Sequence, residues 1–306
     1  MHRFWTLFTG PLVETVKPRR ILEIGAEFGW NTRNILEYCR RSGARADIVD
    51  PVALPSLQEV LAAFPEVHVY HQAKSLQVIS RIEPPDVLFL DGDHNWRTVF
   101  TELTEIYSRA RDRGSPLPIL LAHDCAWPYA RRDMYYDPEA FAPDQRHPYA
   151  YKGMLPGQSE LTDQGLNGRF ANALYEGGPQ NGVLTAIEDF IKSWHTPISL
   201  MILPFFNGLG IAVPAERRAP ELDALLTSFF SGETMLEAAK MLERQMMTTI
   251  AEGLQREALL VRRTDALRRA RELLERQAAR IAELERELAN RGTAARADAH
   301  DRKLGV

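Results

Sequence analysis

The stretch Ile21-Leu-Glu-Ile-Gly-Ala-Glu-Phe-Gly29 decides the fold, because it reads as an apolar strand that ends in a glycine turn. A second apolar run, Asp86-Val-Leu-Phe-Leu-Asp-Gly-Asp-His94, also ends in carboxylates. In an open α/β sheet, ligands bind just beyond the carboxyl ends of the strands. We therefore expect the chemistry of this protein in an acidic site at the ends of these two strands.

The glycine turn is acidic where a dinucleotide-binding turn is not. A nicotinamide dinucleotide fold needs G-x-G-x-x-G, whose second glycine lets backbone amides approach a pyrophosphate. Here the turn is Gly25-Ala-Glu-Phe-Gly29, with Glu23 before it and Glu27 at the place of the second glycine. Two carboxylates repel a pyrophosphate, but they suit a cofactor with a sulfonium and an amino group. The turn therefore indicates S-adenosylmethionine.

Other residues at these strand ends suit the same cofactor. The run Ala46-Asp-Ile-Val-Asp50 supplies a carboxylate about twenty residues past the glycine turn, where a strand-end acid binds ribose hydroxyls. Together and in this order, the elements predict a cofactor site built from Glu23, Gly25, Glu27, Gly29, Asn31, Asp50 and Asp91.

Composition is that of an ordinary soluble globular protein. The 306 residues, 45% hydrophobic and 25% charged, give room for one sizeable domain and an appendage. The net charge of -4 gives no electrostatic case for a nucleic-acid partner. No stretch reaches the roughly eighteen apolar residues of a membrane span, and the apolar start is too short for a signal peptide. We expect a cytoplasmic protein with no membrane partner.

Strands and helices alternate along the chain before Pro214. The apolar patterns predict strands at 20–24, 45–49, 67–71, 87–90, 119–122, 198–203 and 209–213. Helices are predicted at 30–41, 54–63, 74–81, 96–110 and 182–194. Five strands joined by helices and then a hairpin resemble the class I methyltransferase sheet. That sheet is an α/β, Rossmann-like fold of seven mostly parallel strands with a terminal antiparallel hairpin.

A long insert separates the fifth strand from the helix that follows it. Residues 125–181 are rich in Pro, Gly, Tyr and Arg, and a loop of this length inside a compact domain is usually functional or disordered. The aromatic content argues against disorder. We therefore interpret the insert as a substrate lid within a domain that spans 1–218.

The composition changes after Pro220, where Ala, Arg, Glu and Leu become dominant. An apolar residue recurs every seven positions, which on a helix draws one stripe: Leu260, Leu267, Leu274, Ile281 and Leu288. We predict a long helix within 219–290, either a coiled-coil arm of a homodimer or a helix folded back on its own domain. The small and charged residues of 291–306 are typical of a mobile tail.

Carboxylates at two strand ends predict a metal site. Asp91 follows the fourth strand and Asp124 the fifth, and the two would repel one another without a cation or proton between them. Oxygen ligands select a hard cation, so a divalent ion, with magnesium as the first choice, is expected. His123 could ligate the metal, orient Asp124 or pack at the strand end. Cys125 could line the same pocket.

A base is needed to take the proton of an oxygen nucleophile. His94 lies three residues past Asp91, and the pKa of an ordinary histidine is near the operating pH, so His94 is the first candidate. His123 is the second catalytic candidate, and His147 in the lid is another base candidate. Asp93 admits a structural interpretation as the cap of the helix that begins near residue 96.

Three segments resemble one enzyme group. Glu23-Ile-Gly-Ala-Glu-Phe-Gly29, Leu90-Asp-Gly-Asp-His94 and Ala122-His-Asp124 are similar to the class I adenosylmethionine-dependent methyltransferases of the macrocin O-methyltransferase and cephalosporin-hydroxylase-like group. The resemblance covers about residues 15–215. It implies that Asp91 and Asp124 hold magnesium. The chain departs from relatives that carry two acids after the fifth strand, and its lid does not match theirs.

The leading hypothesis is metal-assisted methyl transfer from adenosylmethionine to a hydroxyl of a sugar or another polyhydroxylated small molecule. N-methylation stays open, because the cofactor motifs do not specify the acceptor atom. A non-catalytic adenosylmethionine-binding or scaffolding subunit is the alternative from another class, and the convergent acids argue against it. Glu27 disfavours a nicotinamide oxidoreductase.

Overall fold

The computed structural model describes the backbone of residues 1–301 and the side chains of residues 1–286. The chain divides into two compact units, Met1–Lys240 and the part from Met241 onward. The expected tail, 291–306, lies outside the residues whose side chains are described.

The first unit is built on a sheet of seven strands in the order β3-β2-β1-β4-β5-β10-β9. Strand β10 runs in the direction opposite to the other six strands. Strands β9 and β10 form the predicted terminal hairpin. The predicted Rossmann-like α/β fold is confirmed. The strands are β1 (Arg20–Ile24), β2 (Arg45–Val49), β3 (His68–His71), β4 (Val87–Leu90), β5 (Ile119–His123), β9 (Ile198–Leu203) and β10 (Leu209–Pro214).

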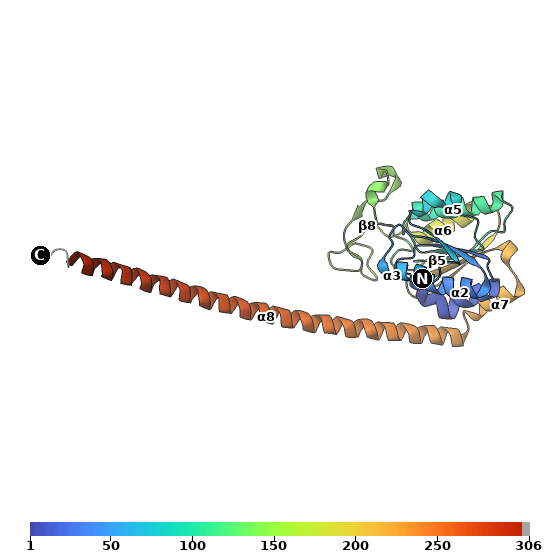
Figure 1. Ribbon diagram of the computed structural model, residues 1–306. Coiled ribbons are helices and arrows are strands. Elements are labelled where there is room, and N and C mark those ends of the chain that lie inside the picture. Colours follow the sequence, from blue (N-terminus) through green and yellow to red (C-terminus); the bar gives the residue numbers. More distant parts are fainter. Residues whose placement is uncertain (302–306) are drawn as a thin grey trace. The chain divides into compact units, whose positions relative to one another are not determined.

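Helices cover both faces of this sheet, with α5 and α6 on one side and α2 and α7 on the other (Figure 1). Two of these helices begin or end where the sequence provides a signal. The Asn95 side chain caps α5 by accepting from Thr98 N at 2.9 Å, and α2 ends at Gly43 with φ 76°. The helices of the first unit are α1 (Gly10–Val16), α2 (Trp30–Ser42), α3 (Pro55–Ala62), α4 (Ser75–Val78), α5 (Trp96–Asp112), α6 (Val183–Ser193) and α7 (Pro220–Ser228).

The sheet register brings the predicted site residues to one edge. Strand β4 is buried on both faces, as its continuous apolar run requires. Ile24 pairs with Leu90, and Leu90 pairs with Ala122, so these residues of β1, β4 and β5 lie at the same level. The residues that follow them, Gly25, Asp91 and His123, are therefore neighbours across the sheet.

The N-terminal segment contributes to the core, which the sequence analysis did not predict. Phe4 and Phe8 are fully buried. The Phe4 ring lies 5.5 Å from the Phe206 ring, and the Phe8 ring 5.3 Å from the Phe229 ring. Because these contacts join distant parts of the chain, no local period in the sequence marks them.

The insert predicted as a lid forms a small sheet of its own, in the order β6-β8-β7. Its strands are β6 (Met134–Tyr135), β7 (Tyr149–Ala150) and β8 (Ala171–Ala173). The side chain of Arg132 is buried within it and donates to the carbonyl oxygens of Ala173 and Ser159. The insert is therefore folded, with a small sheet and a buried arginine of its own.

A buried carboxylate, Asp133, joins the insert to the helices beside it. Its Oδ1 accepts from Trp96 N and from Gly182 N, each at 2.7 Å, and its Oδ2 accepts from the Tyr135 hydroxyl at 2.8 Å. The first two donors precede or begin α5 and α6, where backbone N–H groups lack helical partners. Asp133 thus anchors the insert to two helix N-termini.

We expect Asp133→Asn to destabilise the protein by about 1.5 to 3 kcal/mol. The bonds from Trp96 N and Gly182 N would go to an amide oxygen, which is a weaker acceptor than a carboxylate, and the amide nitrogen in place of Oδ2 cannot accept from the Tyr135 hydroxyl. Urea unfolding measures this loss. Amide exchange at Trp96 and Gly182 should quicken in the variant relative to amides within β1. Unchanged exchange at both amides would show that Asp133 does not hold these helix ends.

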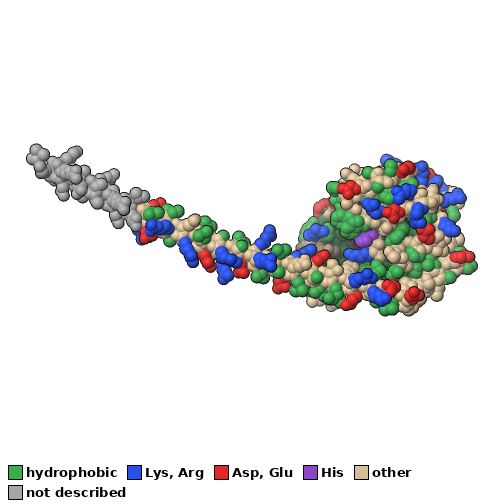
Figure 2. Space-filling model, turned by 60° about the horizontal axis from the view of Figure 1, so that its bottom comes forward, with side chains coloured by type: hydrophobic (Ala, Val, Ile, Leu, Met, Phe, Trp, Pro, Cys, Tyr) green, Lys and Arg blue, Asp and Glu red, His purple; other side chains and the backbone are tan. Residues whose placement is uncertain are grey.

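The long predicted helix is α8 (Gly232–Asp301), which makes up the second unit from Met241 onward. Hydrophobic, basic and acidic side chains occur along its described length (Figure 2). In the described part of the chain, no helix has the length and apolar character needed to cross a membrane. The two expectations for this helix, a dimerisation arm or a fold-back, stay predictions.

Candidate active site

The glycine turn has the backbone conformation that its residues suggest. Gly25 and Gly29 have φ values of +88° and +78°, and Glu27 between them has +46°. A Cβ on Gly25 would lie 2.0 Å from the carbonyl oxygen of Asp91. The turn after β1 therefore packs directly against the backbone after β4, and only glycine fits there.

Two predicted cofactor residues hold the turn in place. The Glu23 carboxylate is buried and accepts from Asn31 Nδ2 at 2.7 Å and from Thr32 Oγ1 at 2.6 Å. Burial raises the pKa of Glu23 to about 7, although both hydrogen bonds oppose this shift. The side chain thus ties β1 to the start of α2.

Asp50, predicted to bind ribose, has several backbone partners inside the protein. Its Oδ2 accepts from Ala26 N and Glu27 N, both at 2.9 Å, and its Oδ1 accepts from Val52 N at 2.8 Å. The carboxylate therefore joins the end of β2 to the glycine turn.

The side chains of Asn31 and Glu27 have polar atoms that could bind a ligand. Oδ1 of Asn31 is buried and has no hydrogen-bond partner among the described residues. Glu27 is an exposed residue, but the partial burial of its carboxyl group, together with the charge of Asp91, raises the pKa of that carboxyl. A buried acceptor without a partner is unfavourable unless a ligand or water satisfies it.

At the ends of β4 and β5, two aspartates and two histidines form one cluster. Nδ1 of His123 lies 3.2 Å from Asp91 Oδ1 and 2.9 Å from Asp124 Oδ2. Nε2 of His94 lies 2.7 Å from the same Asp124 oxygen. All four predicted catalytic and metal residues are thus brought together, and Asp124 occupies the left-handed region with φ 57°.

The charges within this cluster stabilise one another. Burial opposes ionisation of Asp91, but the charge of His123 holds the pKa of that carboxyl at about 2. Burial lowers the pKa of His123, yet the carboxylates of Asp91 and Asp124 outweigh it and raise that pKa to about 10. In the metal-free protein, His123 is therefore an imidazolium between two carboxylates.

The N-terminal segment reaches this cluster, which the sequence analysis missed. The amino group of Met1 donates to Asp91 Oδ2 at 3.0 Å, and the Phe4 ring lies 6.0 Å from the His123 ring. An apolar stretch such as His2–Phe8 carries no motif for such contacts. The aromatic residues near the start of the chain were the one sequence feature that could have indicated that this segment packs against the domain.

The insert also contacts the cluster. Met134 N donates to the carbonyl oxygen of His94 at 3.0 Å, so β6 pairs with the loop after β4. The rings of Tyr129 and Tyr136 lie 5.4 Å and 5.9 Å from the His94 ring. Tyr136 is exposed, with 59% of its surface accessible. The insert therefore places aromatic side chains beside His94.

Some candidates prove to be structural or lie elsewhere. Asn95, not Asp93, caps α5, and Asp93 instead accepts from Thr98 Oγ1 at 3.0 Å. Cys125 is buried against Gly210 in the core instead of lining a pocket. Nε2 of His147 lies 2.8 Å from the carbonyl oxygen of Gln180 and is not part of the cluster.

A buried acid near the loop after β4 was not predicted. Glu102 on α5 is fully buried, and it accepts a hydrogen bond from the Ser75 hydroxyl. Burial raises the pKa of Glu102 to about 8. The folded protein therefore keeps this proton from the ordinary glutamate pKa up to about pH 8, whereas the unfolded chain releases it.

We expect wild-type stability to fall relative to that of Glu102→Gln as the pH rises from 5 to 8, because the amide carries no charge to bury. The difference should change by about 1 to 3 kcal/mol over this window and then level off. Urea unfolding of both proteins at several pH values measures it. Glu105→Gln, on the same helix but partly exposed, should show no such trend, and a pH-independent difference for Glu102→Gln contradicts the assignment.

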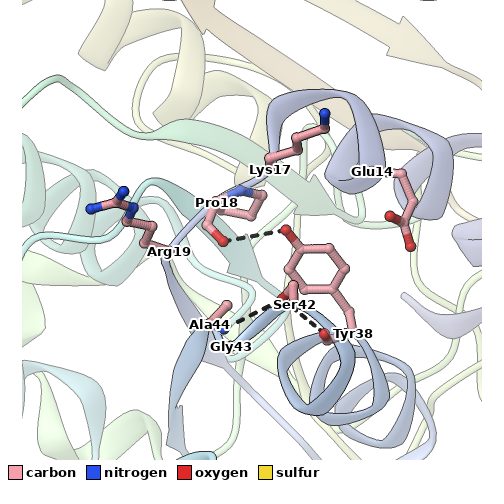
Figure 3. Close-up of a pocket in the computed structure, with 8 residues that line it drawn as sticks. All are labelled: Glu14, Lys17, Pro18, Arg19, Tyr38, Ser42, Gly43 and Ala44. Atoms are coloured by element: carbon pink, nitrogen blue, oxygen red, sulfur yellow. Dashed lines mark hydrogen bonds between the residues drawn. The ribbon is translucent and has the colours of Figure 1, made fainter.

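A separate hollow of about 600 Å³ lies near the start of β1, away from the cluster (Figure 3). It is lined by residues from the end of α1, the segment before β1 and the end of α2. Tyr38 closes one side by donating to the carbonyl oxygen of Pro18. No predicted site residue lines it, so the candidate active site is the cluster at the opposite ends of the strands.

This chain resembles solved structures at low identity. A methyltransferase from Podospora anserina, solved with S-adenosylhomocysteine, is 16% identical, with 67% of this chain and 76% of that chain covered and a TM-score of 0.39. An O-methyltransferase from Streptomyces achromogenes is 14% identical, with 66% and 76% covered and a TM-score of 0.39. Human N-acetylserotonin methyltransferase is 13% identical, with 70% and 53% covered and a TM-score of 0.40.

Among curated proteins, none matches this chain. A family model described as a methyltransferase domain matches residues 22–125. These residues include the glycine turn and the whole cluster of Asp91, His94, His123 and Asp124. The predicted enzyme class is thereby confirmed, and the segment that carries the candidate active site is similar to a methyltransferase domain.

Proposed function

We propose that the protein transfers a methyl group from S-adenosylmethionine to a hydroxyl of a sugar or another polyhydroxylated small molecule, with the help of a divalent cation. The observation that carries this proposal is the partly buried cluster of two aspartates and two histidines beside the glycine turn. A hydroxyl needs a base to lose its proton, and the cluster offers both a base and metal ligands. The resemblance to the macrocin-type and cephalosporin-hydroxylase-like group belongs to the same proposal.

The turn after β1 fits adenosylmethionine in the character of its groups. When bound, this cofactor supplies a methyl group on a cationic sulfonium. The carboxylate of Glu27 offers it an opposite charge, and the unpartnered Oδ1 of Asn31 offers an acceptor for an amino group. Asp50 and Glu23 would act mainly by holding the turn that makes these contacts.

Asp91, His123 and Asp124 suit a divalent cation. Their candidate ligand atoms all lie within 4.8 Å of one another. Two carboxylates and one imidazole form a mixed oxygen and nitrogen set, which magnesium or manganese can use. His123 would have to be neutral as a ligand, so cation binding releases a proton. The bound cation would lower the pKa of an acceptor hydroxyl.

His94 is placed to take the proton from the acceptor. Its Nε2 is directed at Asp124, which orients the ring and leaves Nδ1 as the proton acceptor of the neutral tautomer. Nδ1 is buried and has no partner among the described residues. We propose that the acceptor hydroxyl supplies this missing partner. The acceptor O–H bond would break and its proton would move to Nδ1. The oxygen would take the methyl group as the bond between that methyl and the sulfonium sulfur breaks, and S-adenosylhomocysteine would be the leaving group.

The test has two parts, binding and transfer. Calorimetry should show that the protein binds adenosylmethionine but not a nicotinamide dinucleotide. Methyl-labelled adenosylmethionine with a panel of sugars and glycosides should then label an acceptor with magnesium or manganese present and not with a chelator. Labelling unchanged by chelator contradicts the metal role. Binding without labelling of any acceptor favours the non-catalytic alternative, and labelling only of amines favours N-methylation.

A further inference from the structure

We propose that residues 266–284 of α8 bind the same segment of a second copy of this chain, with the two helices antiparallel. This inference gives the predicted homodimer a specific surface and direction. It concerns α8 alone, so its test does not depend on the methyl-transfer chemistry.

An exposed apolar row runs along this segment. Leu267, Leu274 and Ile281 are 72%, 65% and 57% exposed. Each follows the last by seven residues, which is about 20° short of two full turns of an α-helix. The row therefore stays on one side of the helix over this length.

Other apolar residues widen the row into a face. At about 100° per residue, all seven of the following positions fall within an arc of about 120°: Ala266, Leu267, Ala270, Leu273, Leu274, Ile281 and Leu284. Leu273 and Leu284 are also exposed. All eight charged residues of 266–284 fall outside this arc. Such a face is typical of a helix packed against another apolar surface.

The distribution of charge favours a second copy in the antiparallel direction. Five arginines and one aspartate lie in residues 262–271, whereas residues 272–286 contain four glutamates and three arginines. A parallel pair in register would set the basic half of one helix beside the basic half of the other. The antiparallel pair sets it beside the half that contains the glutamates, so like charges are separated.

A lipid surface is a poorer partner for this helix. A membrane-bound helix concentrates basic residues on its polar face. Here that face also carries acids, and three of its arginines are already paired, Arg268 with Asp265, Arg271 with Glu275 and Arg280 with Glu283. The mixed charge suits the solvated side of a helix pair.

Sedimentation of the full chain tests the surface. The wild type should be a dimer at micromolar concentration, and the double variant Leu267→Glu/Leu274→Glu should dissociate at least about a hundredfold more readily, because two carboxylates enter the apolar layer. Val261→Glu is the matched control and should stay dimeric, because Val261 is an apolar residue, 57% exposed, on the opposite side of the helix. A monomeric wild type, or a double variant as dimeric as the control, overturns the proposal.

Spin labels test the direction. A label at Val261→Cys should be roughly 40 Å from its partner in an antiparallel pair centred near residue 275, but within about 20 Å in a parallel pair in register. The two native cysteines are buried, and the unsubstituted chain gives the background. A short distance overturns the antiparallel arrangement. If the wild type, but not the double variant, floated with vesicles of phosphatidylcholine and phosphatidylserine, the partner of this face would be a membrane and not a second copy of the chain.

Discussion

Replacing Gly25 by alanine is expected to destabilise the first unit by about 3 to 5 kcal/mol, enough to abolish folding in a protein of ordinary stability. The new Cβ would lie 2.0 Å from the Asp91 carbonyl oxygen and 2.7 Å from Gly92 N. Both are backbone atoms at the end of a central strand, so they cannot move aside as a side chain can. The φ of +88° adds strain for any residue with a Cβ.

Gly43→Ala is the matched control for this prediction. Gly43 also has a positive φ, +76°, but nothing lies within 4 Å of the place where its Cβ would be. Its substitution should therefore lower the free energy of unfolding by only about 1 kcal/mol, which is the cost of placing alanine in the left-handed conformation. Urea unfolding followed by circular dichroism compares the two variants. Equal losses would mean that backbone conformation, and not contact between the ends of β1 and β4, requires glycine at position 25.

The strands of the main sheet could be predicted because their signals are local. Strand β4 is an unbroken apolar run, and the turn after β1 carries its own glycines. The parallel arrangement of the strands then follows from the helical crossovers between them. The proximity of Asp91, His123 and Asp124 could therefore be predicted from the sequence. The structure adds that His94 shares an Asp124 oxygen with His123.

The contacts made by distant segments could not be predicted. Asp50 reads as a free strand-end acid, yet it binds the backbone of the glycine turn 23 and 24 residues earlier in the chain. His71 had no acidic neighbour in the sequence, but its Nε2 lies 2.7 Å from Asp47 on the adjacent strand. The β-pairing of the insert with the loop after β4 is likewise a property of the folded chain. The local sequence pattern predicts the strands and helices. The hydrogen-bond partners of these side chains depend on which strands and helices pack together.

The insert and the N-terminal segment together explain why the cluster is partly buried. Phe4 lies beside His123, while Tyr129 and Tyr136 lie beside His94. Neither segment belongs to the sheet that supplies the acids. Exclusion of water strengthens every charge interaction inside the cluster. The sheet therefore positions the reactive groups, and the added segments set their electrostatic environment.

Asp124→Asn is expected to lower the rate of methyl transfer by about a thousandfold, while adenosylmethionine still binds. The substitution removes the carboxylate that His94 and His123 share, at 2.7 Å and 2.9 Å. His94 loses the group that orients its ring, and the proposed metal site loses one of its two anionic ligands. Manganese affinity, followed by electron paramagnetic resonance, should fall in parallel and needs no acceptor.

Asp47→Asn provides the matched control for the Asp124 variant, since it breaks another aspartate–histidine pair at the same 2.7 Å distance. That pair joins β2 to β3, so manganese affinity and methyl transfer should both stay near wild type. Transfer is measured with the acceptor that the glycoside panel identifies, and calorimetry with adenosylmethionine shows that each variant is folded. If Asp124→Asn kept the manganese affinity and rate of Asp47→Asn, the shared carboxylate would have no part in the chemistry. Because both variants keep the size of the side chain, a difference between them isolates the charge at the ends of β4 and β5.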